Sequence, residues 1–491
     1  MSAESRQLAL PLAGISVPPP NGHAIPRKDR VYVNRDLRLS TIDWVGFDMD
    51  YTLAIYRQNE MDRLSVELTI DRLIRRGYPS YLKKLEYDTR FPIRGLLVDK
   101  RYGHVLKMDR YKVVHLGYHG MQKIPREELN ELYHHKRIRP HTPRYHWIDT
   151  LFALSEVTSY AAIVDAMERR KERVDFDKLF ADVRSAIDEA HADGTVYSYV
   201  TSDLERYVER DPDLARTLHK FRSAGKKLFL LTNSPLAYTD RMMTFLLGDA
   251  LPEYPSWRHY FEIVVCSAGK PRWFQEGRPL MEIDGDALRH VKGPLERGKI
   301  YDGGNLADFE RLANLRGSSV LYVGDHIYGD ILRSKKESSW HTAMIIPELD
   351  AEVEAHELTA ADRARQRTLE DARERLENEL RYYQGRYKEL VKSNADDVFA
   401  QAERVRVKRA LERIRAELRA NIAEYDAITE RVSRTFHPYW GSLLKEQSEM
   451  SSFGLQVDLY ADIYTRRVSC LRHYSPQQFF RSPYDLMPHE L

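Results

Sequence analysis

The chain has 491 residues, with 76 lysines and arginines against 74 aspartates and glutamates and a formal net charge of +2. This length suits two or three domains of roughly 100 to 200 residues, and the charge balance excludes a strong overall field that would attract nucleic acid or an anionic membrane. Two cysteines, Cys266 and Cys470, exclude a disulfide framework and favour a reducing cytoplasm. No apolar stretch approaches the ~20 residues of a membrane helix, so no membrane partner is expected.

Residues 1–28 are predicted to form a flexible tail. The weak apolar patch Leu8–Leu12 is interrupted by Pro11, and the run Pro18-Pro19-Pro20 follows. A signal-peptide core is therefore not expected there.

The most informative motif follows a short run rich in β-branched and aromatic residues, Thr41–Phe47, which predicts a buried strand. The run ends at Asp48-Met49-Asp50-Tyr51-Thr52. The carboxyl ends of strands are where open α/β sheets bind ligands. A lone Asp-x-Asp is common by chance, so its meaning depends on motifs further along.

Three later apolar runs also end in polar residues. Leu228–Leu231 leads into Thr232-Asn233-Ser234, Ile263–Cys266 precedes Lys270, and Val320–Val323 ends at Gly324-Asp325. Helical patterns at Leu214–Ala224 and Leu306–Leu315 precede two of these runs. This alternation predicts an α/β fold with a doubly wound, mainly parallel sheet.

The long interval between the first two strands predicts an inserted domain, because a crossover needs only about a dozen residues. We assign residues 29–55 and 215–350 to the catalytic core and residues 56–214 to a mainly helical cap, whose first part is expected to pack with the core. Apolar spacing predicts cap helices at Leu151–Met167 and Asp177–Asp193. Short strands are expected around Gly95–Val98 and Val113–Leu116.

The composition then changes to Glu, Arg, Ala and Leu, which predicts a charged helical hairpin over residues 351–435. Ion pairs and one apolar seam would stabilise it, and we favour packing or self-association over nucleic-acid binding. Residues 436–491 are aromatic and irregular and are expected to pack back on the core.

Taken in order, these motifs resemble the four motifs of the haloacid-dehalogenase (HAD) superfamily. The matching runs are Asp48-Met49-Asp50-Tyr51-Thr52, Leu231-Thr232-Asn233-Ser234, Ala268-Gly269-Lys270-Pro271 and Val323-Gly324-Asp325-His326-Ile327-Tyr328-Gly329-Asp330. More narrowly, Phe47–Ala54, Phe91–Leu96, Val323–Lys336 and His437–Leu443 resemble the cytosolic purine 5′-nucleotidases that prefer IMP and GMP. The similarity runs from about Val31 to the C-terminus.

The resemblance implies a Mg²⁺-dependent 5′-nucleotidase acting on purine nucleoside monophosphates through an aspartyl-phosphate, with phosphoryl transfer to another nucleoside as an additional reaction. Two alternatives stay open. One is the same chemistry on a non-nucleotide phosphomonoester such as a sugar phosphate, and the other is a non-catalytic scaffold acting through the charged hairpin. A scaffold has no need of the carboxylates, threonine and lysine of the four motifs.

Phosphoryl transfer requires these residue types. A carboxylate that attacks a phosphate dianion is repelled by its negative charge, so cations must neutralise both groups. Asp48 is the candidate nucleophile, and Asp50 is the candidate proton donor and water activator. Thr232, the amide of Asn233 and Lys270 would bind the phosphoryl oxygens. By resemblance, Mg²⁺ binds the Asp48 carboxylate, the Asp50 carbonyl and Asp325. Asp330 is expected to hold the waters of the metal or the lysine, with direct binding of the metal as the alternative.

The cap is expected to recognise the base. Arg184, Asp188 and His191 flank the apolar stripe of one predicted helix, and an exposed i,i+4 ion pair is the simpler interpretation of the first two. The resemblance implies that Arg184 and Asp188 contact the purine, that Phe152 stacks on it, and that Ser234 joins Thr232 and Asn233 in the substrate site. Ala192 and Tyr197 stand where the family has Tyr and Lys.

The resemblance also implies a nucleotide effector site at Arg139, Tyr328 and Lys336, where Asp149 replaces an asparagine. The histidine-rich run His134–His146 has no compact metal-ligand spacing and is expected at the surface. The family's acidic C-terminal tail is absent. We expect a cytoplasmic homodimer or homotetramer with no nucleic-acid partner.

Overall fold

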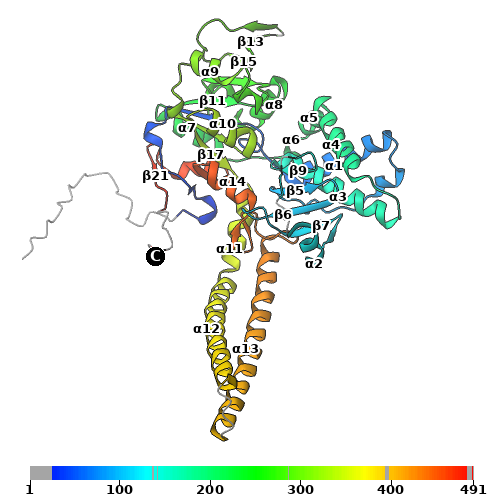
Figure 1. Ribbon diagram of the computed structural model, residues 1–491. Helices are drawn as coiled ribbons and strands as arrows, with labels where there is room; N and C mark the ends of the chain where they lie inside the picture. The colour runs from blue at the N-terminus through cyan, green and yellow to red at the C-terminus, as the bar shows by residue number, and fades with distance from the viewer. Residues whose placement is uncertain are drawn as a thin grey trace, which may run out of the picture.

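The computed structural model describes residues 25–134, 138–140, 142–285, 287–392, 398–483 and 489. Its largest element is a ten-stranded sheet with the order β1-β20-β17-β16-β3-β11-β12-β15-β13-β14, in the upper part of Figure 1. Neighbouring strands from β20 to β15 are parallel, and the pairs β1·β20, β15·β13 and β13·β14 are antiparallel. The strands are, in chain order, β1 (Tyr32–Val33), β3 (Trp44–Phe47), β11 (Lys227–Leu231), β12 (Ile263–Cys266), β13 (Leu280–Asp284), β14 (Ala287–His290), β15 (Ile300–Gly303), β16 (Val320–Gly324), β17 (His341–Ile345) and β20 (Ile463–Thr465).

The four predicted strands are β3, β11, β12 and β16, and they are neighbours at the centre of this sheet. Successive residues of β11 pack on opposite faces: Leu228 and Leu230 belong to one apolar cluster, and Phe229 and Leu231 belong to another. Helices α7 (Leu214–Ser223) and α8 (Leu236–Leu247) contribute to the first cluster, and α9 (Leu306–Leu312) contributes to the second. Helices therefore cover both faces, which confirms the predicted doubly wound α/β fold.

A large region separates β3 from β11, and its first and last strands, β4 (Ile55–Tyr56) and β10 (Val208–Glu209), pair with each other. Its helices are α1 (Gln58–Arg75), α2 (Arg126–Leu129), α3 (Leu154–Arg169), α4 (Phe176–Ala192), α5 (Thr195–Ser202) and α6 (Leu204–Tyr207). Helices α3 and α4 match the two predicted helices. The apolar stripe of α4 is buried as predicted, at Leu179, Phe180, Val183, Ala186, Ile187 and Ala190.

The same region contains more strand than the sequence indicates. A five-stranded antiparallel sheet has the order β8-β7-β6-β5-β9, formed by β5 (Leu96–Asp99), β6 (His104–Met108), β7 (Val114–His119), β8 (Gln122–Lys123) and β9 (Tyr145–Ile148). Only β5 and β7 were expected. Strand β6 lacks a clear apolar pattern because His104 and Lys107 are polar, although both are buried.

Lys107 also shows where the C-terminal segment packs. Its Nζ donates to the carbonyl oxygens of Trp440, Ser442 and Lys445 at 2.7, 2.7 and 2.8 Å, and it lies 3.0 Å from Glu446. This segment contains β18 (Lys445–Glu446), β19 (Glu449–Met450), α14 (Ser452–Tyr460), β20 and β21 (Phe479–Phe480), which pairs with β2 (Leu37–Arg38). The segment thus contacts both sheets, as expected of a C-terminal region that packs back on the core.

A long helical pair projects from the body at the bottom of Figure 1. After α10 (Arg333–Glu337) and α11 (Leu349–Leu358), the pair consists of α12 (Ala360–Lys392) and α13 (Val398–Phe436). A buried seam contains Leu369, Leu390, Val407, Leu411 and Ile414. Ion pairs such as Arg365–Glu424 and Arg386–Glu403 join the two helices, so the predicted hairpin is present.

The domain boundaries themselves stay predictions. The predicted tail lies outside the described residues up to position 24, and Arg27–Asp29 forms a short 3₁₀ turn. Both cysteines are buried and free. No helix in the described ranges is long and apolar enough to cross a bilayer.

Candidate active site

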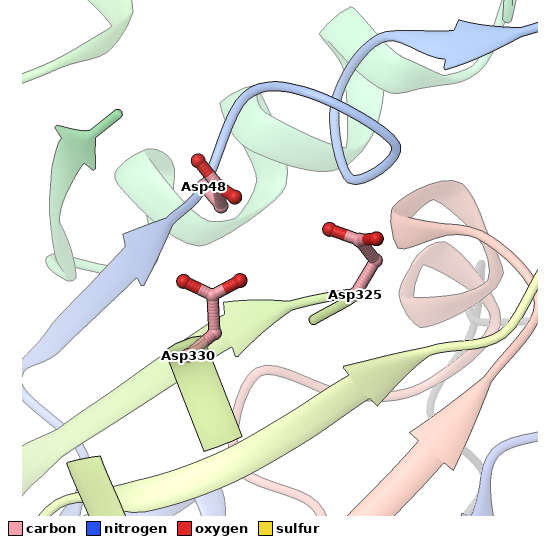
Figure 2. A group of neighbouring side chains, drawn as sticks. All are labelled: Asp48, Asp325 and Asp330. Carbon is pink, nitrogen blue, oxygen red and sulfur yellow. The ribbon is translucent and has the colours of Figure 1, made fainter. Parts of the chain in front are cut away.

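The carboxyl ends of β3 and β16 bring three aspartates together. Asp48 follows β3, and its amide donates to the Val323 carbonyl of β16 at 2.9 Å. Asp325 and Asp330 follow β16. Figure 2 shows the three carboxylates of Asp48, Asp325 and Asp330 turned toward a common space, and one oxygen from each lies within 4.8 Å of the other two.

All three aspartates are buried, and the pKa values of Asp48 and Asp325 are raised. Burial raises the pKa of Asp48 well above its ordinary value, Asp330 and Asp325 add to the shift, and Lys270 opposes it. Burial, with a further contribution from Asp330, raises the pKa of Asp325 to about 7. A dry cluster of carboxylate oxygens with too little positive charge suits a hard divalent cation such as Mg²⁺. The donor set therefore fits the expected metal.

Lys270 places a positive charge next to Asp48. Its Nζ lies 2.9 Å from Asp48 Oδ1 and 2.7 Å from Asp330 Oδ1, and it donates to the Tyr322 hydroxyl at 2.9 Å. Although burial alone would lower the pKa of Lys270, Asp330 and Asp48 hold it well above its ordinary value. The lysine is therefore a fixed cation between two carboxylates.

The loop after β11 connects the lysine to the second aspartate of the motif. Asn233 holds the backbone of Lys270, accepting from its amide at 2.7 Å and donating to its carbonyl at 3.0 Å. Thr232 Oγ1 accepts from the Ser234 amide at 3.1 Å, and Ser234 Oγ donates to Asp50 Oδ2 at 2.7 Å. Thr232, Asn233, Ser234 and Lys270 thus belong to the same constellation as Asp50.

Asp50 is not one of the three clustered aspartates and has its own hydrogen-bond donors. The Tyr56 hydroxyl donates to Asp50 Oδ1 at 2.5 Å and lies 2.8 Å from the Tyr238 hydroxyl. Burial raises the pKa of Asp50, and the donors Tyr56 and Ser234 oppose the shift. A carboxyl group with a raised pKa, held two residues from Asp48, suits a proton donor.

Two of the predicted base contacts, Phe152 and His191, lie close to the tyrosine that donates to Asp50. The Phe152 ring packs against Tyr51 and Tyr56, with centroids 4.8 and 6.0 Å apart, and against His191 at 5.7 Å. Burial lowers the pKa of His191, so the ring is a neutral aromatic surface. Phe152 therefore contacts Tyr56, the donor to Asp50, and His191 packs on the Phe152 ring.

Arg184 and Asp188 lie on α4, the helix of His191, and both are exposed. They do not pair with each other in the described structure. Instead, Arg184 Nη1 lies 2.9 Å from His146 Nδ1. The i,i+4 ion pair between Arg184 and Asp188 is therefore absent, and the Asp188 carboxylate has no ion-pair partner among the described residues.

The three predicted effector residues, Arg139, Tyr328 and Lys336, make their contacts with different neighbours and not with one another in the described structure. Tyr328 accepts a hydrogen bond from Arg333, Lys336 Nζ lies 5.7 Å from the Tyr460 ring centroid, and Arg139 is an exposed residue of a separate loop. Asp149 is 3.4 Å from His326 and raises the pKa of that histidine, despite its burial, to about 9. Part of the histidine-rich run, residues 135–137 and 141, lies outside the described residues.

Sequence interpretation missed several residues that hold the site. Tyr56 and Tyr238 contact Asp50 or its donor, and Tyr322 contacts Lys270. Arg94 is fully buried, donates to the Asp325 carbonyl at 2.8 Å and binds Glu348 through two hydrogen bonds of 2.7 and 2.6 Å. Arg94 lies within the run Phe91–Leu96 that carries the family resemblance, which was the available signal.

Another buried carboxylate adjoins the motif and leads to a stability prediction. Asp62 on α1 accepts from Gln58 at 2.9 Å, its Oδ2 has no hydrogen-bond partner among the described residues, and burial raises its pKa to about 8. Between its unfolded pKa near 4 and its folded pKa, the folded state holds a proton that the unfolded state releases, so stability falls as pH rises through this window.

Asp62→Asn should therefore stabilise the protein by about 1 to 3 kcal/mol at about pH 8, and by much less at about pH 5. Urea unfolding at both pH values measures the difference. Asp71→Asn, on the exposed side of the same helix, is the matched control and should change nothing. Equal effects of Asp62→Asn at both pH values would contradict the proposed burial penalty.

Comparison with known proteins adds independent information. The profile described as the 5′ nucleotidase family matches residues 31–491. Proteins named 5′-nucleotidase domain-containing protein 2 are similar in Rattus norvegicus (31% identity over 479 residues, 93% of this chain and 79% of the relative) and Homo sapiens (31% over 478 residues, 93% and 84%). A solved structure of a predicted phosphoglycolate phosphatase from Haemophilus somnus shares 14% identity over 62% of this chain and 85% of that chain, with a TM-score of 0.25.

Proposed function

Because this chain belongs to the 5′-nucleotidase family, we propose that it is a Mg²⁺-dependent hydrolase that converts purine nucleoside 5′-monophosphates, IMP and GMP foremost, to nucleoside and phosphate. The observation that carries the proposal is the buried cluster in which Lys270 lies within 2.9 Å of Asp48 and 2.7 Å of Asp330. A charge arrangement of this kind stabilises a transferring phosphoryl group, and a structural scaffold would gain nothing from it.

In the first step, an ionised Asp48 oxygen attacks phosphorus. The bond between phosphorus and Asp48 forms while the bond to the ribose 5′-oxygen breaks, and Asp50 gives its proton to that oxygen. Lys270 is a fixed positive charge beside the attacking oxygen, and the Thr232 hydroxyl and Asn233 amide are donors for the phosphoryl oxygens. The short bond from Tyr56 and the bond from Ser234 orient Asp50 for this transfer.

In the second step, water attacks the phosphorus of the aspartyl-phosphate and restores Asp48. Asp50, now ionised, takes the proton from that water. Transfer to the hydroxyl of another nucleoside instead of water would follow the same course. Asp48, Asp325 and Asp330 would hold Mg²⁺, together with the Asp50 carbonyl, and the ion supplies charge neutralisation for the phosphoryl oxygens.

The purine preference rests on the residues around Phe152. Its ring has aromatic neighbours and suits stacking on a base, while Arg184 and Asp188 offer a donor and an acceptor on the adjacent helix. Phosphate release from a panel of nucleoside monophosphates and sugar phosphates tests the proposal. Activity on sugar phosphates alone, with specificity unchanged in Arg184→Ala, would favour a non-nucleotide phosphatase instead.

Removal of divalent cations should abolish the activity, and Mg²⁺ should restore it. Because Mg²⁺ would bind the folded carboxylate cluster and not the unfolded chain, saturation at about 100 times its Kd should stabilise the protein by ~2.7 kcal/mol. Thermal unfolding with chelator and with Mg²⁺ measures this gain. Asp325→Asn should lose most of it, whereas Asp302→Asn, on β15 of the same sheet, should keep it. Full activity in chelator would refute the metal requirement.

Self-association and effector binding belong to the same proposal. We expect a homodimer or homotetramer, with the α12–α13 hairpin as one candidate contact. A nucleotide effector would bind near Arg139, Tyr328 and Lys336. Light scattering and activity with added nucleoside triphosphate test the two expectations.

A further inference from the structure

Glu156 is a buried carboxylate for which the phosphoryl-transfer mechanism has no use. It lies on α3, and its side chain is 9% exposed. Its Oε2 is buried and makes no hydrogen bond with any residue that the structure describes. An unpaired buried acceptor costs about 1 to 3 kcal/mol, so its retention needs an explanation.

The neighbours of Glu156 do not neutralise it. The closest polar atom given for Oε2 is His146 Nε2 at 3.6 Å, which is too long for a hydrogen bond. Burial and the charge of Arg184 lower the pKa of His146 to about 4, so this ring is neutral. Arg184 favours ionised Glu156, whereas Asp188 and Asp149 oppose it, and burial raises the pKa of Glu156 to about 7.

The position of Glu156 connects it to the proposed base site. It follows Phe152 by one helical turn, and Phe152 packs against Tyr56, the donor to Asp50. Across from it, α4 packs on α3 and carries Arg184, Asp188 and His191, and His191 contacts Phe152. Glu156 is thus an acceptor without a partner between the expected stacking ring and the expected polar base contacts.

We propose that Glu156 is a specificity-determining residue of the nucleotide site, and that its free Oε2 accepts the N1–H hydrogen of a 6-oxopurine base. This inference deepens the proposed function and rests on it. Neither the four phosphatase motifs nor the residues expected to contact the base include Glu156.

The chemistry of the bases explains why one acceptor can discriminate. Hypoxanthine and guanine carry a hydrogen on N1, whereas adenine presents a lone pair there. Above its pKa of about 7, the ionised Glu156 can accept from the first two bases, but it faces acceptor against acceptor with adenine and stays unpaired. Sites that leave such a buried group unpaired reject the wrong ligand strongly. A glutamine in its place has an amide donor for the adenine N1.

The test compares Glu156→Gln with the wild type on IMP and AMP. The ratio of kcat/KM for IMP to that for AMP should fall about tenfold or more. The change should appear mainly as a higher KM for IMP, because Glu156 does not touch the reacting phosphate. Glu168→Gln is the matched control on the same helix; Glu168 pairs with His119 at the surface and should leave the ratio unchanged.

A substrate-side measurement covers the case in which Glu156→Gln does not fold. Wild-type protein should bind 1-methylinosine 5′-monophosphate at least about tenfold more weakly than IMP, because the methyl group replaces the N1 hydrogen. Equal affinity for the two nucleotides, or an unchanged IMP to AMP ratio in folded Glu156→Gln, would overturn the inference alone. If the wild type hydrolyses p-nitrophenyl phosphate but no nucleoside monophosphate, the proposed function fails and the inference fails with it.

Discussion

Asp48→Asn is expected to lower kcat for phosphate release by roughly 10⁴-fold or more. The amide cannot attack phosphorus, and it also removes one carboxylate from the trio with Asp325 and Asp330, as well as the 2.9 Å ion pair with Lys270. The substitution is nearly isosteric, so the fold should be retained. Single-turnover phosphate release, with thermal unfolding alongside, measures both.

The matched control for this substitution is Asp43→Asn. Asp43 is an exposed carboxylate immediately before β3, at the end of that strand opposite Asp48. It should keep full activity. Retention of more than about one tenth of wild-type kcat by Asp48→Asn would exclude Asp48 as the nucleophile, because loss of such a group removes nearly all catalysis.

Lys270→Met should lower kcat about 10³-fold, and it should also destabilise the metal-free protein by about 3 to 5 kcal/mol. Its Nζ is the cation 2.9 Å from Asp48 and 2.7 Å from Asp330, and the side chain is only 3% exposed. Without it, buried carboxylates repel one another with no compensating charge. Urea unfolding in chelator measures the stability, and the rate with saturating Mg²⁺ measures the catalysis.

The two effects of Lys270→Met should separate when Mg²⁺ is added. The cation can neutralise the carboxylates and restore part of the stability, but it cannot replace the fixed charge at the attacking oxygen. Lys226→Met is the matched control, because Lys226 is a buried lysine that donates to the Leu39 and Ile42 carbonyls at 2.6 Å. It should lose stability without losing kcat. A Lys270→Met protein with normal kcat would show that the lysine is only structural.

The sequence predicted the ten-stranded sheet well because its central strands are buried on both faces. Leu228–Leu231 and Val320–Val323 are continuous apolar runs, and each ends abruptly in a polar residue, which marks the strand end as well as the strand. The helix α4 was equally clear, since all six residues of its predicted stripe are buried. The sequence pattern was sufficient for strands that are buried along their whole length and for a helix with one continuous buried face.

The sequence pattern was not sufficient where the partners of a buried polar side chain lie in a distant segment of the chain. Strand β6 contains a buried lysine, Lys107, whose charge is satisfied by carbonyl groups more than 330 residues away in the chain. Glu156 lies inside an apolar helix, and nothing in the surrounding sequence indicates that its carboxylate lacks a partner. Such contacts depend on tertiary packing, which periodicity does not encode.

In the candidate active site, too, some residues could be predicted from local motifs and others depend on contacts between distant segments. The spacing of Asp48 and Asp50 indicated two roles, and the structure gives the two carboxylates different surroundings: Asp48 faces Lys270, whereas Asp50 faces Tyr56 and Ser234. The tyrosines that orient the site had no motif of their own. Tyr56 and Tyr238 are 182 residues apart in the chain, and their hydroxyls meet only because the fold brings β4 to the first turn of α8.

The most direct test is to trap the covalent intermediate. The protein is mixed with a purine nucleoside monophosphate labelled in its phosphate, quenched in acid during the first turnover and digested, and the labelled peptide is sequenced by mass spectrometry. Label should appear on Asp48 and be absent from Asp48→Asn. Label on another residue, or no label while the first turnover releases nucleoside, would contradict an aspartyl-phosphate at Asp48.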